Sequence, residues 1–296
     1  MFLTYPCWNT PLIKLEKESK EFGCKIYAKL ELVNPTGSHK DRESVMVILN
    51  MKKKGYNKLA CASSGNAAVS FSAYAYMVGF EAHIFIGSDI PNEKINLIKI
   101  FHPVIHRVKG NYLTAVKALK DFIKNNKHIY NANAGDCPER LIGNSYIGVE
   151  IAKIKPTIVI CPTNNGTHFV GVGKGLLSKR TKAQMVAAIA PKTNIAHSIK
   201  GFYKLEEPKI SELINETKGE IIEVSDDEIK DACISLAKQG IIAEPASAAP
   251  VAALRHLMFT KNDRICVTIT SSGMKFPELM KKILNNRINN FNNLNG

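Results

Sequence analysis

One lysine stands out as a residue that could do chemistry. Lys40 lies in the sequence NPTGSHKDR, residues 34–42, where Pro35 and Gly37 indicate a turn and Ser38 is expected to cap the helix that follows. The amino end of a helix is positive, and together with burial it favours the neutral amine of a lysine in the first turn. A neutral lysine amine can form a Schiff base with a carbonyl compound. A solvated surface lysine is the alternative, which the lysine alone favours.

Two small polar segments follow expected strands and lead into expected helices. Residues 61–68 read CASSGNAA and residues 162–168 read PTNNGTH. Backbone N–H groups at the start of a helix bind carboxylates and phosphates, so each segment could hold an anion. An ordinary strand-to-helix turn explains the first segment equally well. The second is not a Walker loop, because Val172 stands where the lysine of that loop is required.

Two later segments combine small residues with hydroxyl groups. Residues 244–249 read EPASAA, which is typical of a helix that packs closely against another backbone. Residues 270–275 read TSSGMK at the end of an expected strand. Open α/β sheets bind ligands at the carboxyl ends of their strands, so Thr270 and Ser271 are candidate ligand contacts.

The elements that position these segments form a strand-helix rhythm. Short apolar runs alternate with segments of helical period. Strands are expected at 25–32, 58–62, 82–86, 104–108, 157–161, 185–189, 220–224 and 264–270, with helices at 66–78, 92–101 and 112–125. A further helix is expected to begin with a capping box formed by Ser225 and Glu228. Helices threaded between short buried strands indicate parallel pairing. The chain is therefore expected to be an α/β protein with two sheet-centred halves.

Composition limits the class of protein. The 296 residues are 45% hydrophobic, as in ordinary globular enzymes. The seven cysteines are odd in number and never spaced C-x-x-C, so no disulfide framework, zinc site or other metal site is expected. No apolar stretch approaches the ~20 residues that span a bilayer. A cytoplasmic protein without membrane contact is the resulting expectation.

Net charge leaves two classes of partner open. Forty Lys and Arg against 26 Asp and Glu give +14, which suits an anionic small substrate or a nucleic acid. Residues 52–54 are three adjacent lysines, but the basic residues are otherwise spread along the chain and no motif with interleaved aromatic residues appears. The nucleic-acid hypothesis is therefore the less favoured one.

Taken together, the five segments resemble the fold type II pyridoxal-phosphate enzymes of the tryptophan synthase β family, and among them the threonine synthases. The resemblance runs from residues 10–12 to residue 275 with the segments in the family's order. It implies pyridoxal 5'-phosphate as cofactor, a homodimer, and two three-layer α/β/α domains with mostly parallel sheets and the cofactor in the cleft between them. We expect residues 45–135 to form the smaller domain, and residues 1–44 plus 136–296 the larger one.

The resemblance also assigns roles to residues. Lys40 would form the Schiff base with the cofactor and move protons. The remaining cofactor contacts would be Asn66, Asn164, Asn165, Gly166, Thr167 and His168, with Thr270 or Ser271 facing the pyridine nitrogen. The substrate contacts would be Ser63, Ser64, Ala67, Asn131 and Arg140, the last as a bidentate ligand for a phosphate group. Asn164 and Thr167 replace glycines of the family's phosphate loop, so some backbone strain is expected there.

The reaction implied is the conversion of O-phosphohomoserine and water to threonine and phosphate by a lyase. A threonine or serine dehydratase and a β-replacement enzyme of cysteine-synthase type are alternatives on the same fold. Ala132 replaces a serine that the family has beside the residue matching Asn131, which weakens the case for a phosphate leaving group. A pyridoxal-phosphate-binding protein without activity is a further alternative, because of the altered loop.

Overall fold

The chain divides into two compact units. The computed structural model describes residues 8–88 and 92–292. One unit contains Trp8 and Asn34–Tyr146, and the other contains Asn9–Val33 and the chain from Ile147 onward. The predicted domain limits, with residues 45–135 as the smaller domain and residues 1–44 plus 136–296 as the larger one, stay a prediction.

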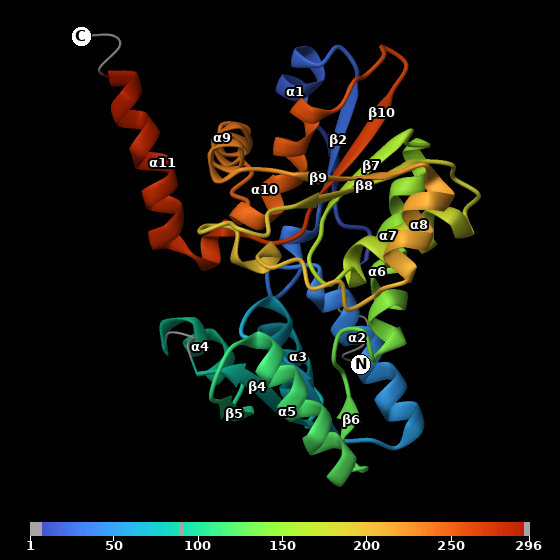
Figure 1. Cartoon of the computed structure of the whole chain (residues 1–296), viewed down its shortest axis with the longest axis vertical. Helices are drawn as coiled ribbons and strands as arrows, with labels where there is room; N and C mark the ends of the chain where they lie inside the picture. Colours follow the sequence, from blue (N-terminus) through green and yellow to red (C-terminus); the bar gives the residue numbers. More distant parts are fainter. Residues whose placement is uncertain (1–7, 89–91, 293–296) are drawn as a thin grey trace. The chain divides into compact units, whose positions relative to one another are not determined.

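The first unit is built on a parallel four-stranded sheet. The strand order is β5-β4-β3-β6, and each neighbouring pair is parallel. Its elements in chain order are α2 (Lys40–Lys54), β3 (Lys58–Ala62), α3 (Asn66–Met77), β4 (Glu81–Gly87), α4 (Asn92–Lys99), β5 (Val104–Val108), α5 (Tyr112–Asn125), β6 (Tyr130–Asn131) and the first part of α6 (Pro138–Ile151) (Figure 1).

Side chains of β3 point alternately to the two faces of this sheet. Leu59 and Cys61 join a cluster with side chains of α2 and α3, whereas Ala60 and Ala62 join a second cluster with side chains of α5. Alternate residues of a strand face opposite sides of its sheet, so helices cover both faces. The unit therefore has the three α/β/α layers that the sequence predicted.

The second unit is built on a six-stranded sheet. Its order is β1-β2-β10-β7-β8-β9, in which only the β1–β2 pair is antiparallel among the pairs of the described chain. Its elements are β1 (Leu12–Lys14), α1 (Glu16–Glu21), β2 (Lys25–Leu30), β7 (Ile158–Pro162), α7 (Thr167–Ser178), β8 (Gln184–Ile189), α8 (Lys209–Thr217), β9 (Glu220–Glu223), α9 (Asp226–Ala237), α10 (Pro245–Ala252), β10 (Arg264–Ile269) and α11 (Pro277–Asn292).

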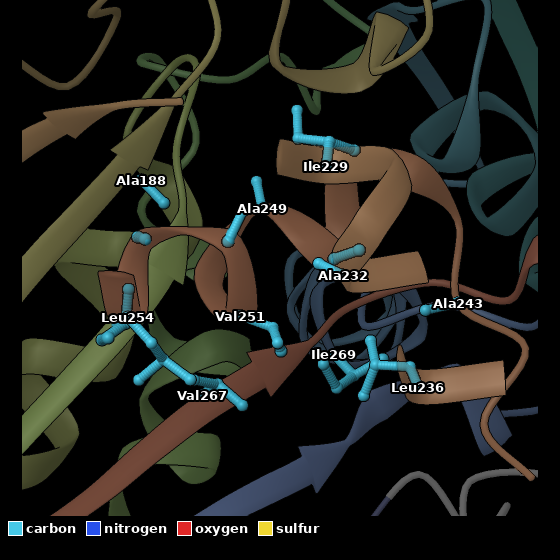
Figure 2. Close-up of a cluster of buried hydrophobic side chains, with 14 of the residues drawn as sticks. Ala188, Ile229, Ala232, Leu236, Ala243, Ala249, Val251, Leu254, Val267 and Ile269 are labelled. Carbon is cyan, nitrogen blue, oxygen red and sulfur yellow. The ribbon is translucent and has the colours of Figure 1, made fainter. Parts of the chain in front are cut away.

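Helices α9 and α10 cover one face of this sheet through a close-packed apolar core. Figure 2 shows Leu236 of α9 and Ala249 of α10 in the same cluster as Val267 of β10. Alanine on α10 lets the helix lie close to the strands, as the EPASAA segment indicated. Helices α7 and α8 pack against β7 and β8, and the buried Phe169 of α7 lies outside that cluster. The second unit is thus also three-layered.

Each sheet reverses its strand order at one point. In the first unit the chain runs outward through β3, β4 and β5 and returns to place β6 beside β3. In the second unit it runs through β7, β8 and β9 and returns to place β10 on the other side of β7. Crevices for ligands form at the carboxyl ends of the strands at such reversals. The fold therefore indicates two places, after β3 and β6 and after β7 and β10.

The strand-helix rhythm of the sequence is confirmed. The strand at 104–108 and the helix at 112–125 coincide with β5 and α5, and the capping box expected at Ser225 and Glu228 begins α9. The short strands β1 and β6 were missed. Over the two described stretches, no helix combines the length and apolar character that crossing a membrane requires.

Candidate active site

Lys40 is the first residue of α2, and the turn before it is fixed by a carboxylate. The N-cap residue is His39, without a side-chain cap. The prediction that Ser38 caps this helix is wrong, since its buried Oγ has no hydrogen-bond partner among the described residues. Instead, the Asp41 carboxylate accepts a bond from the Thr36 backbone N–H at 2.7 Å and another from the Thr36 hydroxyl. These bonds hold the chain where Lys40 enters the helix.

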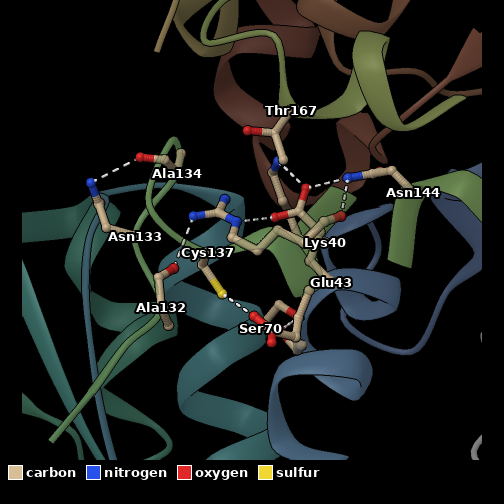
Figure 3. A network of polar contacts seen from close by, with 12 residues as sticks. Lys40, Glu43, Ser70, Ala132, Asn133, Ala134, Cys137, Asn144 and Thr167 are labelled. Atoms are coloured by element: carbon tan, nitrogen blue, oxygen red, sulfur yellow. Dashed lines mark hydrogen bonds and ion pairs between the residues drawn. The ribbon is translucent and has the colours of Figure 1, made fainter. Parts of the chain in front are cut away.

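The amine of Lys40 lies in a buried polar network (Figure 3). Its Nζ lies 2.6 Å from Oε1 of Glu43, one turn further along α2. The same oxygen accepts a bond from Asn144 Nδ2 at 2.8 Å, and the other oxygen, Oε2, accepts one from Arg140 Nε at 2.6 Å. The Glu43 side chain is 0% exposed and that of Lys40 13%. Lys40 is therefore not the solvated surface lysine of the alternative interpretation.

Glu43 is ionised although it is buried. Burial alone raises the pKa of this carboxyl, but the charges of Arg140 and Lys40 and the hydrogen bonds from Lys40 and Asn144 hold the pKa at about 2. Conversely, burial would lower the pKa of Arg140, and the Glu43 charge raises it. Burial raises the pKa of the nearby Cys61 thiol to about 12, so that thiol stays neutral. Lys40 Nζ is therefore the amine of this network that can form a Schiff base once it has given up its proton.

Helix α6 reaches Glu43 because glycine lets two backbones meet. A Cβ at Gly143 would lie 2.4 Å from the backbone oxygen of Arg42 and 2.9 Å from Cα of Glu43. Arg140 and Asn144 are four residues apart and therefore share the face of α6 that lies on α2. Arg140 is further fixed by a bond from Nη1 to the Ala132 carbonyl at 3.1 Å.

The carboxyl ends of β3 and β6 are joined by asparagines. Asn133 is fully buried, and its Oδ1 accepts a bond from the Ala62 N–H at 3.2 Å. Asn131, a predicted substrate contact, accepts a bond from the Asn133 N–H at 3.0 Å. The predicted Ser63, Ser64, Asn66 and Ala67 follow β3 directly and lead into α3, whose N-cap Gly65 supplies no side-chain cap. The first N–H groups of a helix have no partners within it, so this turn can bind an anion.

In the second unit, the loop after β7 is held by hydrogen bonds to residues 198–203. Asn164 donates from Nδ2 to the carbonyls of Ser198 and Lys200 at 3.2 and 3.1 Å. Its Oδ1 accepts a bond from the Tyr203 N–H at 2.9 Å. Asn165 accepts a bond from the Thr167 N–H at 3.2 Å. The side chain of Asn164 thus shapes the loop, which leaves backbone groups as its means of contacting a phosphate.

In this loop only a glycine has the left-handed backbone conformation. Gly166 has φ +92°, whereas Asn164 and Thr167 are not among the residues with positive φ. The strain expected at those two positions is therefore absent. A Cβ at Gly166 would lie 2.4 Å from Cδ1 of Ile210. Glycine is thus required where α7 begins.

His168 is the second residue of α7. Its Nε2 is 2.9 Å from the hydroxyl of Thr268 on β10, and its side chain is buried. The imidazole is therefore turned toward β10. Its contact with the cofactor stays a prediction, and it would have to be made by the backbone of His168.

Two hydroxyl groups follow β10 with different surroundings. Thr270 Oγ1 lies 2.9 Å from Ser247 Oγ on α10. Ser271 is 1% exposed, and its Oγ takes no hydrogen bond from residues 8–88 or 92–292. A buried hydroxyl without a partner is costly, so Ser271 Oγ has the capacity to bind a ligand atom.

The predicted residues thus fall into one group per unit. Lys40, Arg140, Asn131 and the 63–67 turn belong to the first unit, and the 164–168 loop with Thr270 and Ser271 to the second. Each group lies where its sheet reverses strand order. Sequence reasoning missed Glu43, Asn133 and Asn144. The spacing of Glu43 from Lys40, three residues along one helix face, was a signal for the first of these.

Comparisons with known proteins agree with this arrangement. A family model described as pyridoxal-phosphate dependent enzyme matches residues 3–271. The threonine synthase of Halalkalibacterium halodurans is 32% identical over 91% of this chain and 83% of its own length. That of Methanocaldococcus jannaschii is 31% identical over 91% of this chain and 76% of its own.

Solved structures share the fold. O-acetyl serine sulfhydrylase isoform 3 from Entamoeba histolytica matches with a TM-score of 0.80 at 19% identity, over 95% of both chains. Maize serine racemase matches with a TM-score of 0.80 at 18% identity, over 95% of this chain and 93% of its own. The two-unit α/β architecture with mostly parallel sheets is therefore confirmed.

Proposed function

Because this chain belongs to the family of pyridoxal-phosphate-dependent enzymes, we propose that it is a lyase of the threonine synthase type, which converts O-phosphohomoserine and water to threonine and phosphate. The observation that carries the proposal is the similarity to threonine synthases along nine-tenths of the chain, together with a buried lysine at the amino end of α2.

The residues present fit pyridoxal phosphate. Ser271 Oγ is buried without a partner in the described parts of the chain, and it can meet the pyridine nitrogen. The amino end of α7, opened by Gly166, suits a phosphate group. Lys40 supplies the amine that such an aldehyde requires. Asn66 and Asn165 stay proposed cofactor contacts.

When bound, pyridoxal phosphate supplies an electron sink that stabilises negative charge at the substrate's α carbon. The residues of this chain do the rest. Lys40 Nζ takes the α proton and returns it at a later step. Ser63, Ser64 and Ala67, at the amino end of α3, hold the substrate carboxylate. A hydroxyl at the pyridine nitrogen cannot compensate a positive ring as a carboxylate would, which suits elimination and replacement rather than transamination.

Arg140 is the proposed contact for the phosphate leaving group. Its Nε donates to Glu43 and its Nη1 to the Ala132 carbonyl. Nη2 makes no hydrogen bond within the described chain and can donate to a phosphate oxygen. Because Glu43 already pairs with the guanidinium, the attraction for a dianion is weaker than that of an unpaired arginine.

That same pair favours the second candidate function, a threonine or serine dehydratase. An arginine whose charge is already paired with Glu43 suits a substrate that carries no phosphate. The two candidates differ in their products. Threonine synthase activity releases inorganic phosphate, whereas a dehydratase releases ammonia and a 2-oxo acid.

The deciding experiment uses the purified protein. Its visible spectrum is recorded with pyridoxal phosphate, and then O-phosphohomoserine, O-phosphoserine and threonine are added separately. We expect phosphate and threonine from O-phosphohomoserine and no phosphate from O-phosphoserine. Ammonia and 2-oxobutyrate from threonine, without turnover of O-phosphohomoserine, would instead establish the dehydratase.

Two variants test the residue assignments. Lys40→Ala should remove the visible absorbance of the bound cofactor, and a retained band with full activity would assign the Schiff base to another lysine. Arg140→Ala should reduce turnover of O-phosphohomoserine far more than turnover of an unphosphorylated analogue. Equal losses would contradict the phosphate contact. The predicted homodimer and cytoplasmic location stay predictions.

A further inference from the structure

The proposed function uses Lys40 and Arg140 but gives no role to the carboxylate between them. Glu43 is fully buried, and each of its oxygens has its own partners. Oε1 contacts Lys40 Nζ at 2.6 Å and Asn144 Nδ2 at 2.8 Å, and Oε2 contacts Arg140 Nε at 2.6 Å. Burying an ionised carboxylate is costly unless it is paired. A buried carboxylate against the reactive amine therefore calls for an explanation.

We propose that Glu43 is a positioning residue for Lys40, which holds the ε-amine in place and keeps the proton that the amine takes up. The inference rests on the proposed function, because it assumes that Lys40 is the residue that moves protons.

The carboxylate is held from the side of α6, independently of Lys40. Arg140 Nε binds Oε2, and Arg140 is itself fixed by the Ala132 carbonyl and lies over the ring of Phe71, 5.4 Å from its centroid. Asn144 binds Oε1 and is also bonded to the Arg140 carbonyl at 3.0 Å. When the amine of Lys40 moves, Oε1 therefore stays where it is. A fixed acceptor can bind the ammonium group of Lys40 in the same position again after each proton transfer.

Charge balance gives the carboxylate a second effect. Lys40 and Arg140 are two cations that share one anion. The other titratable groups around it include the His39 ring, 3.7 Å from Oε1, and the thiols of Cys61 and Cys137. With Glu43 in place, the protonated amine has a counter-charge. Without it, that counter-charge is lost while the like charge of Arg140 remains in the network, and a nearby like charge disfavours the charged form. Glu43 thus favours the ammonium, and a neutral residue there would favour the nucleophilic amine.

The test measures the reactivity of Lys40 directly, without substrate or cofactor. The full-length protein is reductively methylated with formaldehyde and cyanoborohydride across a pH series, and the modification of each lysine is followed by peptide mass spectrometry. Only a neutral amine reacts. We expect Glu43→Gln to shift the midpoint for Lys40 to lower pH and to raise its modification rate at neutral pH about tenfold, which corresponds to one pK unit.

Glu18→Gln is the matched control. Glu18 is also a buried carboxylate, but it accepts bonds from Ser235 and Gln239 in the second unit. This variant should leave the Lys40 midpoint at its wild-type value. Exposed lysines such as Lys179 report in every sample whether the reagent acts uniformly.

A conservative variant separates charge from shape. Glu43→Asp keeps the negative charge, but its side chain is one methylene shorter, so the carboxylate lies further from Lys40. The pH midpoint for methylation of Lys40 in this variant should therefore lie between those of wild type and Glu43→Gln. If Glu43→Gln does not fold, Glu43→Asp must still lower the midpoint, and an unchanged value overturns the proposal. An unchanged or raised midpoint in folded Glu43→Gln overturns it as well, as does a Glu43→Asp value equal to that of Glu43→Gln.

The holoenzyme provides a kinetic readout. Glu43→Gln should lower kcat while leaving KM close to wild type, because the carboxylate acts on Lys40 rather than on the substrate. A rise in KM with unchanged kcat would contradict the positioning role. The methylation experiment needs no turnover, so a failure of the proposed threonine synthase activity would leave its result readable.

Discussion

Replacing Gly143 by alanine tests whether α2 and α6 must touch for the Lys40 network to form. The added Cβ would lie 2.4 Å from the Arg42 carbonyl oxygen and 2.6 Å from its carbon, whereas ordinary contact begins at 3.4 Å. The clashing atoms belong to the backbone and cannot rotate away. The helices must therefore separate by about 1 Å, which stretches the 2.6 Å bond from Arg140 Nε to Glu43 beyond hydrogen-bonding distance.

Two opposing effects set the magnitude. Alanine is favoured over glycine inside a helix by about 1 kcal/mol. Overpacking costs about 1–3 kcal/mol, and more where the surroundings cannot yield. Because the conflict is with backbone atoms, we expect the steric cost to exceed the gain. The free energy of unfolding of Gly143→Ala should fall by about 1–2 kcal/mol.

Urea unfolding followed by circular dichroism measures this difference. Ser145→Ala is the control on the same helix, since it removes only a hydroxyl that bonds to the Ile142 carbonyl within α6. That variant should stay within about 0.5 kcal/mol of wild type. A Gly143→Ala protein as stable as wild type, with unchanged reactivity of Lys40, would refute the close approach and the network built on it.

Three further predictions follow from individual side chains. The pKa of Glu43 is about 2 in the folded chain, below its ordinary value of 4.5. A depressed carboxyl pKa contributes stability above pH 4.5 that is lost as the pH falls toward 2. The stability advantage of wild type over Glu43→Gln should therefore shrink by about 3 kcal/mol between pH 6 and pH 2 in urea unfolding. Gly166→Ala should weaken pyridoxal phosphate binding at least about fivefold in a fluorescence titration, because left-handed backbone costs a non-glycine residue about 1–3 kcal/mol. Gly240→Ala, at φ +80° with nothing within 4 Å of its Cβ, controls for that strain and should bind normally. Ser271→Ala should weaken cofactor binding while leaving stability unchanged or raising it, because its hydroxyl has no partner to lose. Thr270→Val loses the bond to Ser247 and should lower stability. Weaker cofactor binding in Thr270→Val and not in Ser271→Ala would assign the pyridine contact to Thr270.

The sequence by itself determined the order of strands and helices, because those signals are local. The strand at 104–108 and the helix at 112–125 were placed to the residue, since hydrophobic period and capping residues lie within the segment that they specify. The two-residue strand β6 was missed, because two residues are too few to show a period. The five segments that resemble the pyridoxal-phosphate enzymes could likewise be recognised in the sequence, since each motif is contiguous.

Only the tertiary structure decided which side chains meet. Glu43 and Arg140 are 97 residues apart and come together because a glycine lets α6 lie on the first turn of α2. Ser38 resembles a helix cap in sequence, but the Asp41 carboxylate fixes the turn instead. Such pairings depend on where helices cross and on which donor lies within hydrogen-bonding distance of an acceptor. A linear pattern records neither, so the partner of the reactive lysine became visible only in the folded chain.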